Sequence, residues 1–226
     1  MSVLLFDIDG TLLMAPGVGR RHFESALTAL CGRRVSADGV AFAGRTDRSL
    51  AREMLERAGY TEEIENAITE VLDAYAARVE DDIQPEDVDI LPGVRALLDE
   101  LQDDPGLDLG VLTGNLERTG RAKLAAGALD DFFSFGAFGS DHEDRNELPF
   151  FARTRATSVL GRPVAFASLV IIGDTEHDVR CGHHVGARTV AVCTGNVDRE
   201  SLLTAGPDLL LEDLTERQRL RQFLGR

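Results

Sequence analysis

The sequence predicts an α/β protein whose core has three layers, with helices on both faces of a mostly parallel sheet. Apolar runs of strand length alternate with helical patterns from about residue 86 onward, and this alternation is typical of parallel sheets that are buried on both faces. Residues 16–85 break the alternation, because they contain amphipathic helical patterns and no strand. We therefore expect a core made of residues 1–15 and 86–226, with a helical domain, residues 16–85, inserted after the first strand.

The strands of the core are expected where short apolar runs end in polar or glycine-containing turns. The predicted strands are Val3–Phe6, Leu107–Leu112, Leu169–Ile172 and Thr189–Val192, with Phe135–Phe138 and Leu209–Leu211 as weaker candidates. Helices are expected between them, at Val94–Gln102, Leu116–Ala126, Leu148–Leu160 and Val179–Val185.

The inserted domain is predicted to contain three amphipathic helices, at Arg21–Leu30, Arg48–Arg57 and Glu62–Val79. The chain enters this domain just after the first strand and leaves it before Leu91, so the domain should lie over the strand ends as a lid. A lid can exclude water and contribute contacts to a substrate.

Composition excludes several classes of protein. The net charge of −15 argues against a nucleic-acid or anionic-membrane partner, since both need a basic surface. No apolar run approaches the roughly 20 residues of a membrane helix, and the N-terminus has no basic segment typical of a secretory signal. Three scattered cysteines suggest reduced thiols rather than a disulfide framework. We expect a cytoplasmic protein, either a monomer or a homodimer.

Two carboxylates follow the first predicted strand. Asp7 and Asp9 stand between the apolar run Val3–Phe6 and a Gly-Thr break, at the strand end where α/β sheets bind ligands. Desolvation and mutual repulsion make such a pair costly unless a cation is present. One carboxylate could then attack an electrophile while the other transfers a proton.

Two other strand ends carry polar groups suited to the same site. Thr113 follows the second main strand, and Asp174 follows the third, with Asp178 four residues later. Mg²⁺ prefers oxygen ligands and keeps several waters. Asp7 and Asp174 could therefore supply carboxylate ligands, while Asp178 could hold a ligand water.

These residues resemble three motifs of the haloacid dehalogenase-like hydrolase superfamily. The segment Asp-Ile-Asp-Gly-Thr-Leu-Leu at 7–13 matches the first motif, Leu-Thr-Gly-Asn at 112–115 the second, and Gly-Asp-Thr-Glu-His-Asp at 173–178 the fourth. They occur in the family's order and span nearly the whole chain. The resemblance implies a Rossmann-like core with a C1-type cap, as in phosphoglycolate phosphatase-like members.

The resemblance also implies a reaction. Asp7 would attack phosphorus and form an aspartyl-phosphate, and Asp9 would protonate the leaving oxygen and then deprotonate the attacking water. Asp7, Asp174 and the backbone carbonyl of Asp9 would ligate Mg²⁺, with Asp178 beside them. The implied activity is Mg²⁺-dependent hydrolysis of a small phosphorylated metabolite.

The substrate would be held by residues of the second motif and of the inserted domain. Thr113 would donate a hydrogen bond to the phosphoryl oxygens, and Gly114 and Asn115 are expected to line the site. Gly44-Arg45-Thr46-Asp47 could be a substrate loop in which Arg45 reaches a second anionic group, or a turn in which Asp47 caps the next helix. The sequence leaves both interpretations open.

The third motif departs from the family pattern, which places a lysine between the second and fourth motifs. The single lysine of the chain, Lys123, lies in the predicted helix directly after the second motif, which is too early. Arg145 stands at the expected place. We assign it to neutralising Asp7 and the phosphate, although a surface arginine before a helix is the alternative. Arginine stays charged, but its planar fork differs from a point charge.

The same core could also support activities other than phosphate-ester hydrolysis. A phosphomutase similar to β-phosphoglucomutase would need groups of the inserted domain that engage a second sugar hydroxyl. That domain has no lysine and one histidine, His22, which favours hydrolysis. Dehalogenation is disfavoured because it needs no acid such as Asp9, and a phosphonatase would need a lysine in the cap. A non-catalytic regulatory protein that kept the fold is disfavoured by the cost of unused buried carboxylates.

Overall fold

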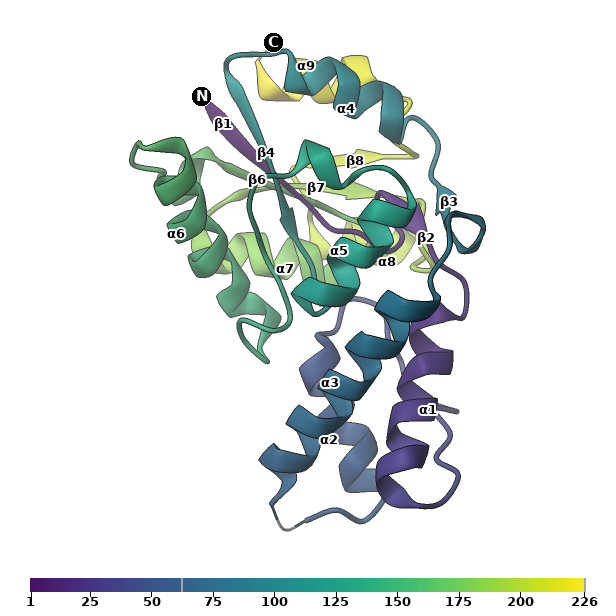
Figure 1. Ribbon diagram of the computed structural model, residues 1–226. Helices are drawn as coiled ribbons and strands as arrows, with labels where there is room; N and C mark the ends of the chain where they lie inside the picture. The colour runs from purple at the N-terminus through teal and green to yellow at the C-terminus, as the bar shows by residue number, and fades with distance from the viewer. Residues whose placement is uncertain (62, 226) are drawn as a thin grey trace.

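A computed structural model describes residues 1–61 and 63–225. Its main sheet has six strands in the order β5-β4-β1-β6-β7-β8, and every neighbouring pair is parallel. This arrangement confirms the predicted parallel α/β core (Figure 1). The strands are β1 (Ser2–Phe6), β4 (Leu107–Leu112), β5 (Gly136–Ala137), β6 (Leu169–Gly173), β7 (Arg188–Val192) and β8 (Leu209–Leu211).

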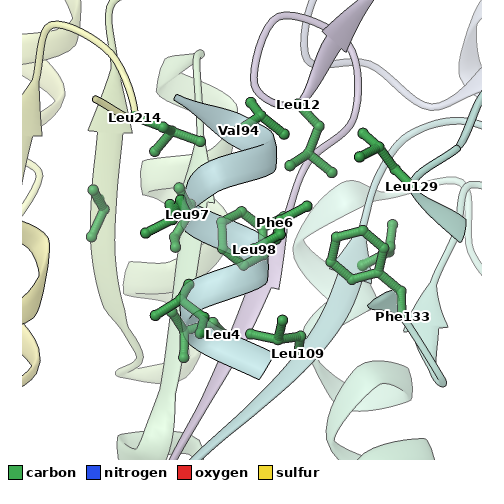
Figure 2. Packing of buried hydrophobic residues seen from close by; sticks show 14 of the residues in the cluster. Leu4, Phe6, Leu12, Val94, Leu97, Leu98, Leu109, Leu129, Phe133 and Leu214 are labelled. Carbon is green, nitrogen blue, oxygen red and sulfur yellow. The ribbon is translucent and has the colours of Figure 1, made fainter. Parts of the chain in front are cut away.

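Alternation along β1 builds the two sides of the core. Leu4 and Phe6 face one hydrophobic cluster, whereas Val3 and Leu5 face another, as expected of side chains that point to opposite faces of a sheet. Figure 2 shows Leu4 and Phe6 against the apolar side of α4. The first cluster lies under α4 (Val94–Gln102), α5 (Glu117–Ala126) and α9 (Arg217–Leu224). The opposite face packs against α6 (Leu148–Leu160), α7 (Glu176–Val185) and α8 (Arg199–Ala205).

A separate group of three helices extends from one end of the sheet (Figure 1). We call these helices, together with the segment that joins the first two, the helical unit. It has its own hydrophobic cluster, in which the rings of Phe23 and Tyr75 lie 4.7 Å apart between centroids. Its helices are α1 (Val18–Cys31), α2 (Asp47–Arg57) and α3 (Ile64–Asp82). The third was predicted from Glu62, which lies outside the described residues.

The chain crosses between the core and the helical unit at a small antiparallel pair. This pair consists of β2 (Leu13–Met14) and β3 (Asp89–Ile90), and the sequence did not predict it because two-residue strands carry no periodic pattern. The short helices α8 and α9 were also not predicted. Four single-turn 3₁₀ helices complete the described elements, namely η1 (Pro85–Asp87), η2 (Asp130–Phe132), η3 (Arg145–Glu147) and η4 (Phe166–Ser168). None of the helices described has the length and apolar character needed to cross a membrane.

Candidate active site

The carboxyl ends of three central strands meet under the helical unit. Asp7 follows β1, Thr113 follows β4 and Asp174 follows β6, and these strands are direct neighbours in the sheet. A cavity of about 580 Å³ lies between them and the helical unit. Predicted site residues that line the cavity are Asp7, Asp9, Thr113, Gly114, Asn115, Arg145, Asp174 and, from the helical unit, Arg45.

Three buried carboxylates form the base of the site. Asp7, Asp174 and Asp178 each offer an oxygen within 4.8 Å of the others. Burial raises the pKa of Asp7 to about 6, and the charge of Asp178 adds to this effect while Arg145 opposes it. The pKa of Asp174 is raised well above its usual range by burial and by the charge of Asp7. If all three were ionised, these carboxylates would carry more negative charge than the neighbouring guanidinium can neutralise.

The donor set fits a hard divalent cation such as Mg²⁺. Its ligands would be oxygens, and the cation would offset the burial and the mutual repulsion that raise the pKa values of Asp7 and Asp174. Asp178 has little capacity left for direct ligation, since its Oδ2 accepts from Thr175 (N–H, 3.1 Å; Oγ1, 2.7 Å) and its Oδ1 from Arg145. Asp7 and Asp174 are therefore the carboxylates best placed to hold an ion.

Close backbone approach shapes the position of Asp174. A Cβ atom on Gly195 would stand 1.7 Å from Asp174 Oδ2, and one on Gly10 would stand 2.3 Å from the same oxygen. Asp174 Oδ1 accepts a 3.3 Å hydrogen bond from the hydroxyl of Thr11. The glycines after β1 and β7 thus leave room for this carboxylate beside Asp7.

Arg145 is buried and faces two of the carboxylates. Its Nη2 lies 3.1 Å from Asp7 Oδ2 and also donates to Asp178 Oδ1. Burial disfavours the charged guanidinium, but Asp178 and Asp7 outweigh this and raise its pKa. The thiol of Cys181, on α7, donates to the carbonyl of Arg145 at 3.2 Å. The alternative of a surface arginine is therefore wrong.

The guanidinium of Arg145 also has an unused donor. Among the buried side-chain atoms that the structure describes, its Nε is without a hydrogen-bond partner. An unpaired buried donor is costly, and Arg145 is one of the residues that line the cavity.

Asp9 lies at the edge of the cavity, half-exposed and held by side chains from α5 and the segment before it. The ammonium of Lys123 contacts both of its carboxylate oxygens, at 2.9 Å (Oδ1) and 2.7 Å (Oδ2). Nδ2 of Asn115 donates to Asp9 Oδ2 at 2.7 Å and to Thr113 Oγ1 at 2.9 Å. The side chains of Asn115 and Thr113 are therefore linked to Asp9 as well as exposed to the cavity.

Lys123 lines the cavity and pairs with Asp9, but it was not predicted to belong to the site. It was set aside as too early for the third motif, and it does not contact Asp7 in the way that Arg145 does. The helical spacing of Lys123 could have indicated that it is buried. Residues 116, 119, 120 and 123 lie on one face of the predicted helix, and the first three are small or apolar. A lysine on a buried face is almost always paired.

The helical unit is docked on the second motif. The amide of Asp47 donates to the carbonyl of Gly114 at 2.8 Å, and Asp47 Oδ2 accepts from the amide of Leu116 at 2.8 Å. The hydroxyl of Thr46 caps α2 by accepting from the amide of Ser49 at 3.2 Å. The alternative interpretation, in which Asp47 caps the next helix, is therefore wrong, because Thr46 is the cap and the Asp47 side chain accepts from the amide of Leu116 at the start of α5 instead.

Arg45 lines the cavity, but its charge is engaged within the helical unit. Its guanidinium binds the carboxylate of Glu53 and donates to the carbonyl of Ser49 at 3.1 Å. Its own carbonyl oxygen lies against Gly114, where a Cβ atom would be 1.9 Å away. The substrate-loop interpretation of Arg45 stays a prediction.

Comparisons with known proteins agree with this architecture. A family model described as haloacid dehalogenase-like hydrolase matches residues 4–192. Phosphoglycolate phosphatase from Synechococcus elongatus is 34% identical over 125 residues, which cover 54% of this chain and 55% of that protein. The match therefore spans about half of that relative.

Two further comparisons cover nearly the whole chain. Pyrophosphatase PpaX from Anoxybacillus flavithermus is 25% identical over 96% of this chain and 94% of its own. Among solved structures, a predicted phosphatase from Clostridium acetobutylicum superposes with a TM-score of 0.74 at 20% identity, over 100% of this chain and 99% of the other. That structural likeness supports the fold.

Proposed function

The chain belongs to the haloacid dehalogenase-like hydrolases, and on that premise we propose that it is a Mg²⁺-dependent phosphatase of a small phosphorylated metabolite. The observation that carries this proposal is the buried Asp7 carboxylate, which faces Arg145 at 3.1 Å and shares its site with Asp174 and Asp178. Such a group is poorly suited to a purely structural role, since burial and repulsion raise its pKa to about 6.

The proposed first step forms an aspartyl-phosphate on Asp7. A carboxylate oxygen of Asp7 attacks phosphorus, the bond to the ester oxygen breaks, and Asp9 gives its proton to the departing oxygen. Thr113 and Arg145 donate hydrogen bonds to the phosphoryl oxygens, which stabilises the charge that develops there. Asp7, Asp174 and the carbonyl oxygen of Asp9 would hold the cation, which supplies further positive charge against those oxygens.

The second step regenerates the enzyme. Asp9, now a carboxylate, takes a proton from a water molecule as the water attacks phosphorus. The bond between phosphorus and Asp7 breaks, inorganic phosphate leaves, and Asp7 returns to its carboxylate form. The same side chain thus serves first as acid and then as base, at a half-exposed position on the edge of the cavity.

We propose that the helical unit is the cap of this site. Its docking on Gly114 through Asp47 closes a cavity whose size suits a small molecule. Apolar side chains of the unit, including Phe42 and Leu50, face this space, where they would exclude water and contact the leaving group. Arg45 is proposed to contact the substrate from the same side.

The phosphomutase alternative has less support. Among the described residues that line the cavity, His22 does not occur; it is buried, with Nε2 3.5 Å from a carboxylate oxygen of Asp82. The cap histidine is therefore not positioned to engage a second sugar hydroxyl.

The proposal is tested by assaying p-nitrophenyl phosphate and a panel of small phosphate monoesters, with Mg²⁺ and with EDTA. We expect turnover that requires the metal, and Asp7→Asn should reduce kcat by at least about 10³-fold, because an amide is not a nucleophile. Asp108→Asn, at the opposite end of β4, is the matched control and should keep its activity. Absence of turnover on the whole panel, or an active Asp7→Asn variant, would contradict the proposal.

A further inference from the structure

We propose that Lys123 and Asn115 are positioning residues that hold the Asp9 carboxylate in its reactive orientation, an inference that rests on the proposed phosphatase function. No motif of the sequence assigns a role to Lys123. The proposal comes from a closed set of hydrogen bonds that begins at Thr113 and ends at Asp9.

All hydrogen-bond donors of the Lys123 ammonium are used by Asp9 and Asn115. Its side chain is 5% exposed, and its three donors meet three acceptors: Asp9 Oδ1, Asp9 Oδ2 and, at 2.8 Å, Asn115 Oδ1. An ammonium group has no further donor. Lys123 therefore has no hydrogen bond left for a substrate and acts through Asp9.

Asn115 fixes the orientation of this pair. Its Oδ1 accepts from Lys123, while its Nδ2 donates both to Asp9 at 2.7 Å and to Thr113 at 2.9 Å. The amide can satisfy all of these contacts in only one flip state. Asn115 thereby links the carboxylate of Asp9, which follows β1, to the hydroxyl of Thr113, which follows β4. Both groups take part in the proposed transfer of the same phosphoryl group.

Asp9 needs such support because of where it lies. Its side chain is 42% exposed, and an exposed carboxylate on a turn can occupy several rotamers. An acid and base must lie within hydrogen-bond reach of the leaving oxygen and of the attacking water. A displacement of about 1 Å in a reacting group can cost about 100-fold in rate, so a side chain that fixes Asp9 has a large effect without contacting the substrate.

The inference is tested by a double-mutant cycle with p-nitrophenyl phosphate as the probe. Lys123→Met keeps the length of the side chain but removes its donors, and we expect kcat to fall about 10- to 100-fold while KM changes less than about threefold. In an Asp9→Asn background, where the carboxylate is already absent, the same substitution should change kcat less than about twofold, because coupled residues are not additive.

Three further variants separate positioning from a general structural effect. Lys123→Arg, which keeps the charge and donors, should recover part of the lost kcat. Asn115→Ala should also lower kcat, and this effect should disappear in the Asp9→Asn background. Because Asn115→Ala tests the same hydrogen bonds, the inference can still be tested if Lys123→Met does not fold. Arg121→Met, on the same helix but paired with Asp130 at 2.8 Å, is the matched control and should retain wild-type kcat.

The outcomes distinguish this inference from the proposed function. A wild-type protein without phosphatase activity would refute the proposed function itself. An active wild type with unchanged kcat in both Lys123→Met and Asn115→Ala would overturn the positioning role alone. Equal losses with and without the Asp9 carboxylate would also overturn it, since Lys123 would then act on the substrate or on the fold.

Discussion

Replacing Arg145 with methionine removes the guanidinium that faces two buried carboxylates. Arg145 is 7% exposed, as is the Asp7 side chain beside it, and Asp178 is 1% exposed. Methionine fills a similar volume and supplies no charge, so both carboxylates lose their shared cation. In the metal-free protein, no bound ion compensates for this loss.

The expected cost follows from the burial of this pair. Removing one partner of a buried ion pair costs about 3–5 kcal/mol, because the remaining charge stays desolvated. For a chain of this length that corresponds to a decrease in Tm of about 6–20 °C. Lysine at position 145 should recover only part of this free energy, since a single ammonium does not reproduce the planar fork that reaches both Asp7 and Asp178.

The loss should depend on pH with a definite sign. The pKa of Asp7 is about 6 in the folded protein, against an ordinary value of 3.8, even with Arg145 present, and removal of the guanidinium raises it further. A carboxyl group whose pKa is raised by folding contributes stability below its unfolded pKa, and that contribution is lost as the pH rises through the folded pKa. The part of the Arg145→Met deficit that comes from Asp7 should therefore be small near pH 5 and complete near pH 8, so the total deficit should be larger at pH 8.

Urea unfolding in EDTA at pH 5 and pH 8 measures this deficit. Arg162→Met is the matched control, because it breaks a partly exposed pair with Asp108, and should cost about 1 kcal/mol or less at either pH. A deficit for Arg145→Met below about 1 kcal/mol at pH 8, or a deficit that is larger at pH 5, would refute this account of the site.

Two other predictions concern the cation and the docking of the helical unit. Mg²⁺ at about 100 times its Kd should add about 2.7 kcal/mol to the free energy of unfolding, which is measured as a rise in Tm. Asp174→Asn should abolish this rise. An undiminished rise in the variant would show that Asp174 is not a ligand of the metal. Gly114→Ala places a Cβ atom 1.9 Å from the carbonyl oxygen of Arg45, so the helical unit must move and kcat should fall about 10-fold or more. Gly120→Ala is the control, because its Cβ atom would meet the flexible end of Ile8 at 3.1 Å and would be in ordinary van der Waals contact with Phe138 and Asn115 at 3.5 and 3.6 Å. Equal kcat values for the two variants would contradict the docking argument.

Local patterns were sufficient for most of the core. The strand Leu107–Leu112 and the helices Val94–Gln102 and Leu148–Leu160 have the predicted bounds, because each carries an apolar period long enough to recognise. The short elements escaped prediction for the opposite reason. The pair of β2 and β3 has two residues a strand, and its existence depends on the chain crossing twice at one place.

The sequence by itself determined the parallel α/β core and the acids at its strand ends. Asp7 and Asp174 are far apart in the chain, but each directly follows a buried strand, and parallel neighbouring strands bring their carboxyl ends together. The same argument predicted that Thr113, which directly follows β4, lies at this edge of the sheet. The positions of the strands and of the polar residues that follow them are local patterns, whereas the strand order β5-β4-β1-β6-β7-β8 came from the structure.

Only the tertiary structure decided that Lys123 pairs with Asp9 and that Arg145 also meets Asp178, whereas the role of Arg145 beside Asp7 was assigned from its place in the sequence. Arg145 and Lys123 lie on segments whose path over the sheet has no local signature, and their partners, Asp7 and Asp9, differ by two residues. Which cation meets which acid depends on the packing of α5 and η3 against the sheet, and burial then makes each pairing nearly obligatory. The contact of Asp47 with the start of α5 could not be predicted for the same reason, since it joins two segments that are far apart in the sequence and depends on how the helical unit lies on the core.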